Sequence, residues 1–119
     1  MNTIDIKEAL SCFHGTTKYY IHQLLPGLQL KLTDGCHYLR ETCKCYWLFD
    51  IIASYHGQLK DADFQVWHLK KVKGDEFTIS CTDGNNNELA CQEIPFSDFP
   101  LDSITIWVVN GVALLPSEY

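Results

Sequence analysis

The sequence predicts a single α+β domain: helices in the N-terminal half pack on one face of an antiparallel meander sheet formed mainly by the C-terminal half. Two observations predict this class. Apolar residues follow a helical period over much of the chain before Gly57, and after it they alternate with a period of two. A length of 119 residues gives room for one hydrophobic core, so residues 1–119 are assigned to one domain.

Residues 46–55 carry the strongest helical pattern. Their apolar side chains fall at i, i+1, i+4, i+5 and i+8, which places them in one stripe along a helix. The stripe consists of Trp47, Leu48, Ile51, Ile52 and Tyr55. Asp50 and Ser54 fall on the opposite side, and Gly57 suits the end of the helix. We expect the sheet to pack against this stripe.

The N-terminal third predicts one short helix and two short strands. Residues 3–14 form a helix that Gly15 ends, and residues 16–25 and 28–32 form strands joined by a turn at Pro26-Gly27. A second helix opens at Thr33 or Asp34, either of which can cap its first turn.

This second helix is not expected to continue into residues 46–55. Extending the apolar stripe backwards by helical steps reaches Lys44, Glu41 and His37, which are polar. The two patterns therefore belong to separate helices, with a break between Thr42 and Cys45.

After Gly57 the chain predicts consecutive strands separated by turns. The strands are residues 64–72, 77–82, 88–96, 103–110 and 112–115. Gly and Asn residues at 73–75, 83–87 and 110–111 have the chemistry of hairpin turns. Cys81 and Cys91 flank the middle turn and could face each other across it.

Composition argues against several functional classes. The formal net charge is −6, from 9 Lys and Arg against 15 Asp and Glu, which disfavours binding to the phosphates of nucleic acid. No apolar run approaches the roughly 18 residues of a membrane span, and the acidic N-terminus does not resemble a signal peptide. We therefore expect a cytoplasmic protein without a membrane partner, whose six cysteines are reduced thiols.

Cysteine and histidine residues between positions 36 and 56 are of the types that bind metals. The set is Cys36, His37, Cys43, Cys45 and His56. The Cys-Lys-Cys spacing is not that of a zinc knuckle, and no second cysteine pair follows it. We expect no bound metal, and nothing in the sequence indicates another cofactor.

No motif identifies a catalytic residue. There is no Gly-x-Ser-x-Gly sequence and no cysteine with a recognisable local signature, and the five histidines are dispersed. A small enzyme or small-ligand-binding protein would use a polar and aromatic group in the region 19–34. That candidate cluster is Tyr19, Tyr20, His22 and Asp34.

A second candidate is an apolar surface on the face of the sheet without helices. Residues 103–110 have no polar side, because Trp107 and Val109 alternate with Ile104, Ile106 and Val108. If the pleats of two strands agree, that face carries Trp67, Leu69, Trp107 and Val109. Such a surface would bind a second copy of the chain or another protein. The alternative is that residues 16–32 fold back and cover it.

Several phrases together resemble an uncharacterised family of small bacterial proteins carried on chromosomes and mobile elements. They are residues 13–16 (FHGT), 33–35 (TDG), 46–48 (YWL), 64–67 (FQVW), 97–101 (SDFPL) and 115–119 (LPSEY). The resemblance implies a bacterial or phage origin and no activity or site residue. Cys43 and Cys45 depart from it, because the family tends to have small residues there.

The sequence thus favours a non-catalytic protein-interaction module that forms a homodimer. The alternative is the enzyme or ligand-binding protein that uses Tyr19, Tyr20, His22 and Asp34. An enzyme needs a concave pocket with convergent polar groups, whereas a module needs an exposed apolar face.

Overall fold

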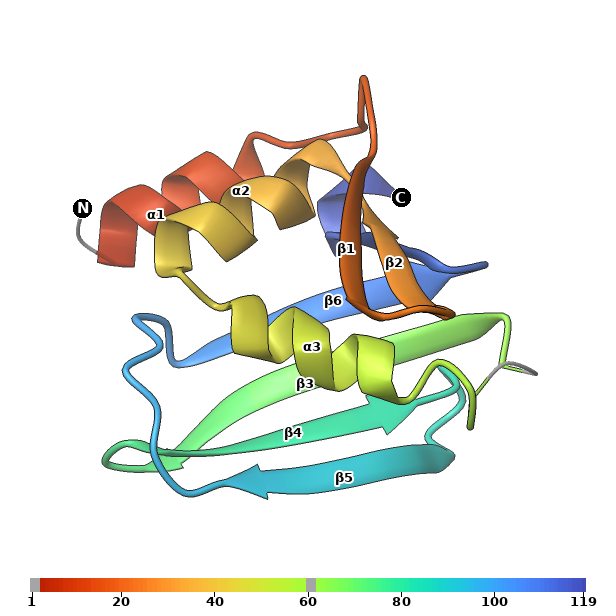
Figure 1. The fold of residues 1–119 in the computed structure, drawn as a ribbon. Coiled ribbons are helices and arrows are strands. Elements are labelled where there is room, and N and C mark those ends of the chain that lie inside the picture. Colours follow the sequence, from red (N-terminus) through yellow and green to blue (C-terminus); the bar gives the residue numbers. More distant parts are fainter. Residues whose placement is uncertain (1–2, 60–61) are drawn as a thin grey trace.

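Three α-helices cover one face of a curved sheet in the computed structural model, which describes residues 3–59 and 62–119 (Figure 1). The helices are α1 (Thr3–Ser11), α2 (Asp34–Cys43) and α3 (Tyr46–Ser54). The strands are β1 (Tyr20–Leu25), β2 (Leu28–Leu32), β3 (Phe64–Lys73), β4 (Glu76–Thr82), β5 (Glu88–Ile94), β6 (Ser103–Val109) and β7 (Val112–Leu114). A 3₁₀ turn, η1 (Pro116–Glu118), follows β7. The predicted α+β class is confirmed.

The predicted break between the second and third helices is confirmed. α2 ends at Cys43, and Lys44 adopts a left-handed conformation with φ of 53° while its N–H bonds to the Arg40 carbonyl. At the other end of α2, Thr33 is the cap, and its hydroxyl accepts a hydrogen bond from the Cys36 N–H at 3.4 Å. The change of helical phase in the sequence was therefore a correct signal.

Two strands are shorter than predicted by two residues or more, each for a local reason. β1 begins at Tyr20 instead of residue 16, because Thr17 binds the carboxylate of Asp34 through its N–H and its hydroxyl. β5 ends at Ile94 because Pro95 has no N–H to continue the ladder. The tight turns fall where predicted, with positive φ at Gly27, at Gly74 and at residues 110–111.

The strand order departs from a simple meander. Among the described residues it is β1-β2-β7-β6-β3-β4-β5, so β6 pairs with β3 and not with its sequence neighbour β5. β2 and β7 run parallel, which makes the sheet mixed. The connection 95–102 carries the chain from β5 to the far side of β3, and its Phe99 and Leu101 are buried in the core.

The β1–β2 hairpin extends the sheet instead of covering it. Its backbone continues the ladder beyond β7, with Lys31 N–H to Gly111 O and Thr33 N–H to Ala113 O, both at 3.1 Å. The alternative in which residues 16–32 fold over the helix-free face is therefore wrong. On that face the Tyr119 ring lies against Trp107 and Phe64, and Thr16 and Tyr19 border a hollow beside Val109 and Val112.

The core lies between α3 and the sheet. Leu48 and Ile52 of the predicted stripe are almost fully buried. Phe49 is buried as well, because the β1–β2 hairpin packs on its side of α3 and brings the His22 ring within 5.9 Å of it. The largest fully buried side chains elsewhere are Trp67, Phe77, Leu30, Leu32, Leu39, Leu69, Ile79, Leu101 and Ile106.

All six cysteines are free thiols. Cys81 pairs with Ala90 and Cys91 with Ser80, so the two cysteines flanking the 83–87 turn lie on opposite faces of the sheet and cannot meet across it. Within the described residues, helices of membrane-spanning length and apolarity are absent.

Candidate functional site

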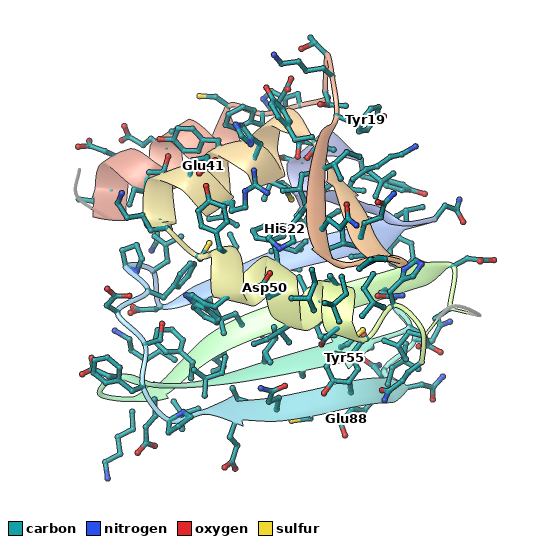
Figure 2. The ribbon with its side chains drawn as sticks, in the orientation of Figure 1. Tyr19, His22, Glu41, Asp50, Tyr55 and Glu88 are labelled. Atoms are coloured by element: carbon teal, nitrogen blue, oxygen red, sulfur yellow. The ribbon has the colours of Figure 1, made fainter. Side chains whose placement is uncertain are left out.

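The predicted polar cluster does not form as one group. His22 lies between β1 and α3, with Asp50 beside it, whereas Tyr19 points away near the top of the β1–β2 hairpin (Figure 2). Tyr20 stacks on His37, with ring centroids 3.7 Å apart and planes 3° from parallel. Asp34 instead holds the 16–18 loop.

His22 is the centre of a network that the sequence did not reveal. Its Nε2 lies 2.7 Å from Asp50 Oδ1, and its Nδ1 lies 2.9 Å from an Arg40 guanidinium nitrogen. Arginine can only donate, so Nδ1 accepts and Nε2 carries the proton that is donated to Asp50. This assigns one neutral tautomer and leaves no free lone pair on the ring.

Arg40 connects this pair to the rest of α2. Its guanidinium lies 3.3 Å from His37 Nδ1 and 3.5 Å from Glu41 Oε1, and it covers the Tyr46 ring at 4.9 Å. The Tyr46 hydroxyl donates to Glu41 and lowers the pKa of that carboxyl group. The Arg40 Nε atom is buried without a hydrogen-bond partner.

This network fits a structural role better than a catalytic one. His22 can act as a base only after its bond to the Arg40 guanidinium breaks, which would remove one hydrogen-bond partner from a charged residue that is 8% exposed. Three cavities of about 170, 400 and 340 Å³ in the described part of the chain are lined by other side chains. The network therefore ties β1, α2 and α3 together.

The face that the helices leave uncovered, called here the outer face, carries a bounded apolar region. Strand pairing sets one row of side chains across five strands, and a second row lies beside it. The first row is Ile21, Lys31, Val112, Val109 and Phe64, and the second is Leu114, Trp107 and Val66. The next row is polar and consists of Thr105, His68 and Ser80.

Two members of the predicted surface are on the other face. Trp67 is 2% exposed and Leu69 is 1% exposed, and both are in the core under α3. Trp67 pairs with Ile106, whereas Trp107 pairs with Val66, so neighbouring pairs put the two tryptophans on opposite sides. The prediction that Trp67 and Leu69 share a face of the sheet with Trp107 and Val109 is therefore wrong. Trp107 and Val109 do lie on the outer face and are half-buried.

Tyr119 completes the outer face from the C-terminus. Its ring lies 5.3 Å from Trp107 and 6.2 Å from Phe64, edge-on to both, and it is 77% exposed. We define the outer patch as Ile21, Phe64, Trp107, Val109, Val112 and Tyr119.

Glu118 fixes the position of Tyr119. Its carboxylate accepts hydrogen bonds from Thr33 Oγ1 at 2.6 Å, from the Leu115 N–H at 2.9 Å and from the Gly35 N–H at 3.1 Å. The terminal phrase LPSEY therefore docks on the N-terminus of α2, where a negative charge is favoured. The Thr33-Asp34-Gly35 phrase offered no sign that Glu118, 83 residues beyond Gly35, is its partner.

The candidate metal ligands do not converge. Within the ranges that the structure describes, no group of three or more His, Cys, Asp or Glu side chains could hold a metal ion. Cys36 and Cys45 are buried, and burial raises the pKa of both thiols well above the ordinary value for cysteine, so that both stay protonated at neutral pH.

Comparison with known proteins gives a family and no function. The model of a family described as "Family of unknown function (DUF6876)" matches residues 4–119. No curated protein and no solved structure matches the chain.

Proposed function

We propose that this chain, which belongs to DUF6876, a family of unknown function, is a non-catalytic protein-interaction module that self-associates through the outer patch. The observation that carries the proposal is the row across five strands in which every side chain except Lys31 is apolar, with Trp107 and Tyr119 beside it. Aromatic side chains of this size contribute about 2–3 kcal/mol each when an interface buries them.

The occupant that we propose is a second copy of the chain. Lys31 is the single charged member of the first row. A twofold axis near Val112 would lay Ile21 of one copy on Phe64 of the other and keep the two Lys31 side chains apart. The contact would then be formed mainly by apolar side chains and bring no two like charges together, although the whole chain has a net charge of −6.

The same proposal places the module in the cytoplasm. Six unpaired thiols, of which Cys12 and Cys91 are exposed, are stable in a reducing compartment and vulnerable in an oxidising one. A bacterial origin, expected from the resemblance of the sequence, is compatible with this placement.

Light scattering tests the proposal directly. We expect the wild-type protein to be a dimer at micromolar concentration, and Trp107→Glu and Tyr119→Glu to be folded monomers. Tyr119 is the safer position because its side chain is 77% exposed and little packing is lost. Ser103→Glu makes the same change of charge on the outer face of β6 but outside the patch, and should leave the dimer intact.

Circular dichroism establishes that each variant is folded. A wild-type protein that remains monomeric at 100 times the working concentration would refute self-association through this face. So would a dimer that both Trp107→Glu and Tyr119→Glu leave unchanged.

A further inference from the structure

β5 is an edge strand with an unused side. It is the last strand in the sheet order, and among the described residues its backbone bonds within residues 88–94 go to β4 alone. An edge of this kind offers a row of N–H and C=O groups to another extended chain.

A groove runs beside this edge on the helix side of the sheet. It has a volume of about 400 Å³ and lies between α3 and the end of β5. Trp47 and Ile51, one helical turn apart, form one wall, and Ile94, Pro95 and Phe96 form the other. We call these residues the edge groove. Phe96 is 72% exposed, which is unusual for an aromatic side chain without a partner to cover it.

The edge groove is held in shape by its surroundings. The Ser97 N–H donates to the Asp75 carbonyl at 2.9 Å, and the Ser97 hydroxyl accepts from the Phe99 N–H at 3.1 Å. The Phe99 ring then packs edge-on against Trp47 at 6.3 Å and against Phe77 at 6.0 Å. A groove that exists before binding spares a ligand the entropy of ordering it.

The two faces of β5 differ in chemistry. Gln92 and Ile94 pair with Ile79 and Phe77, so they point to the helix side and toward the edge groove. Glu93 pairs with Thr78 and points to the outer face, where it is exposed. Asp98 is a charged residue of the groove lining and is also acidic, so each face of this edge carries negative charge.

We propose that β5 and the edge groove bind an extended segment of a partner protein, which adds to the sheet as an eighth strand. Its alternate apolar side chains enter the groove between Trp47, Ile51 and Phe96. The side chains between them are Lys or Arg, and one of these lies opposite Glu93 on the outer face. The segment therefore reads apolar-basic-apolar-basic, with the backbone supplying affinity and the two faces supplying specificity.

The charges favour this occupant over a second copy of the chain. Antiparallel pairing of two β5 strands would bring Glu88 and Glu93 of each copy into the same short ladder, with no cation on either strand. The inference does not depend on the dimer proposed above, because the outer patch lies on the opposite face and nearer to the other edge.

A synthetic peptide with the sequence Lys-Leu-Lys-Val-Lys-Leu-Lys is the probe. We expect it to shift the backbone NMR signals of residues 90–96 and those of Trp47 and Ile51. A peptide of the same composition with its four lysines in one block should bind at least fivefold more weakly, because it cannot place apolar and basic side chains on alternate faces. The acidic counterpart, with Glu for Lys, should not bind.

Matched variants separate the groove from simple charge attraction. Ile51→Glu should weaken binding more than tenfold, while Ser54→Glu, which adds the same charge to the exposed side of α3, should leave it unchanged. Glu93→Lys should weaken binding about threefold to fivefold, the effect of losing one cross-strand charge pair and creating a repulsive one. Glu8→Lys on α1 makes the same change of charge elsewhere and should have no such effect.

Phe96→Ala keeps the test decisive if Ile51→Glu does not fold, because Phe96 is exposed and its loss should weaken binding about threefold. Equal binding of the alternating and block peptides would overturn the proposal. Signals that shift on β1 or on the outer patch instead of β5 would also overturn it, as would a β5 edge already protected from hydrogen exchange by a second copy.

Discussion

Glu118 is expected to hold the C-terminal turn to the domain, and Glu118→Ala should remove that attachment. The substitution deletes one carboxylate that accepts three hydrogen bonds, from Thr33, Leu115 and Gly35. It also leaves the two backbone N–H groups among these donors without a protein partner in a partly buried position.

The size of the effect follows from these three bonds. A hydrogen bond to a charged group contributes about 1.5–3 kcal/mol, and three that share one carboxylate are not additive. Water can reach part of this site, which lowers the value further, so we expect Glu118→Ala to reduce the free energy of unfolding by about 3 kcal/mol. Glu118→Gln keeps the shape and one acceptor oxygen, and should cost about half as much.

Urea denaturation followed by tryptophan fluorescence measures the loss, and Gly35 provides an internal check. A Cβ atom on Gly35 would lie 2.6 Å from Glu118 Oε1 and 2.6 Å from Leu115 Cδ1. Gly35→Ala should therefore destabilise the wild type strongly and the Glu118→Ala protein less, which gives a favourable coupling in the double-mutant cycle. A loss below about 0.5 kcal/mol for Glu118→Ala, or strictly additive effects, would show that η1 is not docked in this way.

Three further results are expected. His22→Ala should lower the free energy of unfolding by about 3 kcal/mol, because it leaves the buried Arg40 guanidinium with one partner fewer. The double variant His22→Ala/Arg40→Met should recover part of that loss, because it also removes the buried charge. A loss of the same size in the double variant would contradict this explanation. Hydrogen bonds from the 16–18 loop lower the pKa of Asp34 in the folded protein. The stability that its carboxylate contributes is therefore present above the unfolded pKa of about 4 and is lost as the pH falls below it. The melting temperature of Asp34→Asn should accordingly be lower than that of the wild type at pH 7, and the two should become equal toward pH 2. Cys12 and Cys91 should react rapidly with a thiol reagent in the native protein and the other four cysteines slowly, so a count of more than two fast thiols would be inconsistent with the fold.

Local elements were predictable because local patterns decide them. The break near Lys44 followed from a change of helical phase within some twenty residues. Turn residues such as Gly74 and Asn110 adopt the positive φ that their type suggested. Strand order was not predictable in the same way, because it depends on pairing between segments such as β3 and β6 that lie about forty residues apart.

The candidate sites were only partly predictable for a related reason. Each strand showed its own alternation, so Trp107 and Val109 were correctly placed together on one face. Whether Trp67 shares that face depends on the register between two strands, and a shift of one residue reverses the answer. The sequence predicted His22 as a member of a polar cluster, but its partners Arg40 and Asp50 come from two other elements and no spacing in the sequence relates them to it.

One connection, residues 95–102, accounts for both the unexpected topology and the edge groove. A tight turn after β5 would have placed β6 beside it, and the β5 edge would then have been paired and closed. Instead Ser97 anchors the segment to the β3–β4 turn, and Phe99 and Leu101 enter the core, so that the chain leaves β5 as an edge and passes the N-terminal end of α3 (Figure 1). Pro95 and Phe96 are left outside as the wall of the groove. The buried residues of this connection therefore hold a strand edge open, and shortening the connection should close the edge and abolish peptide binding together.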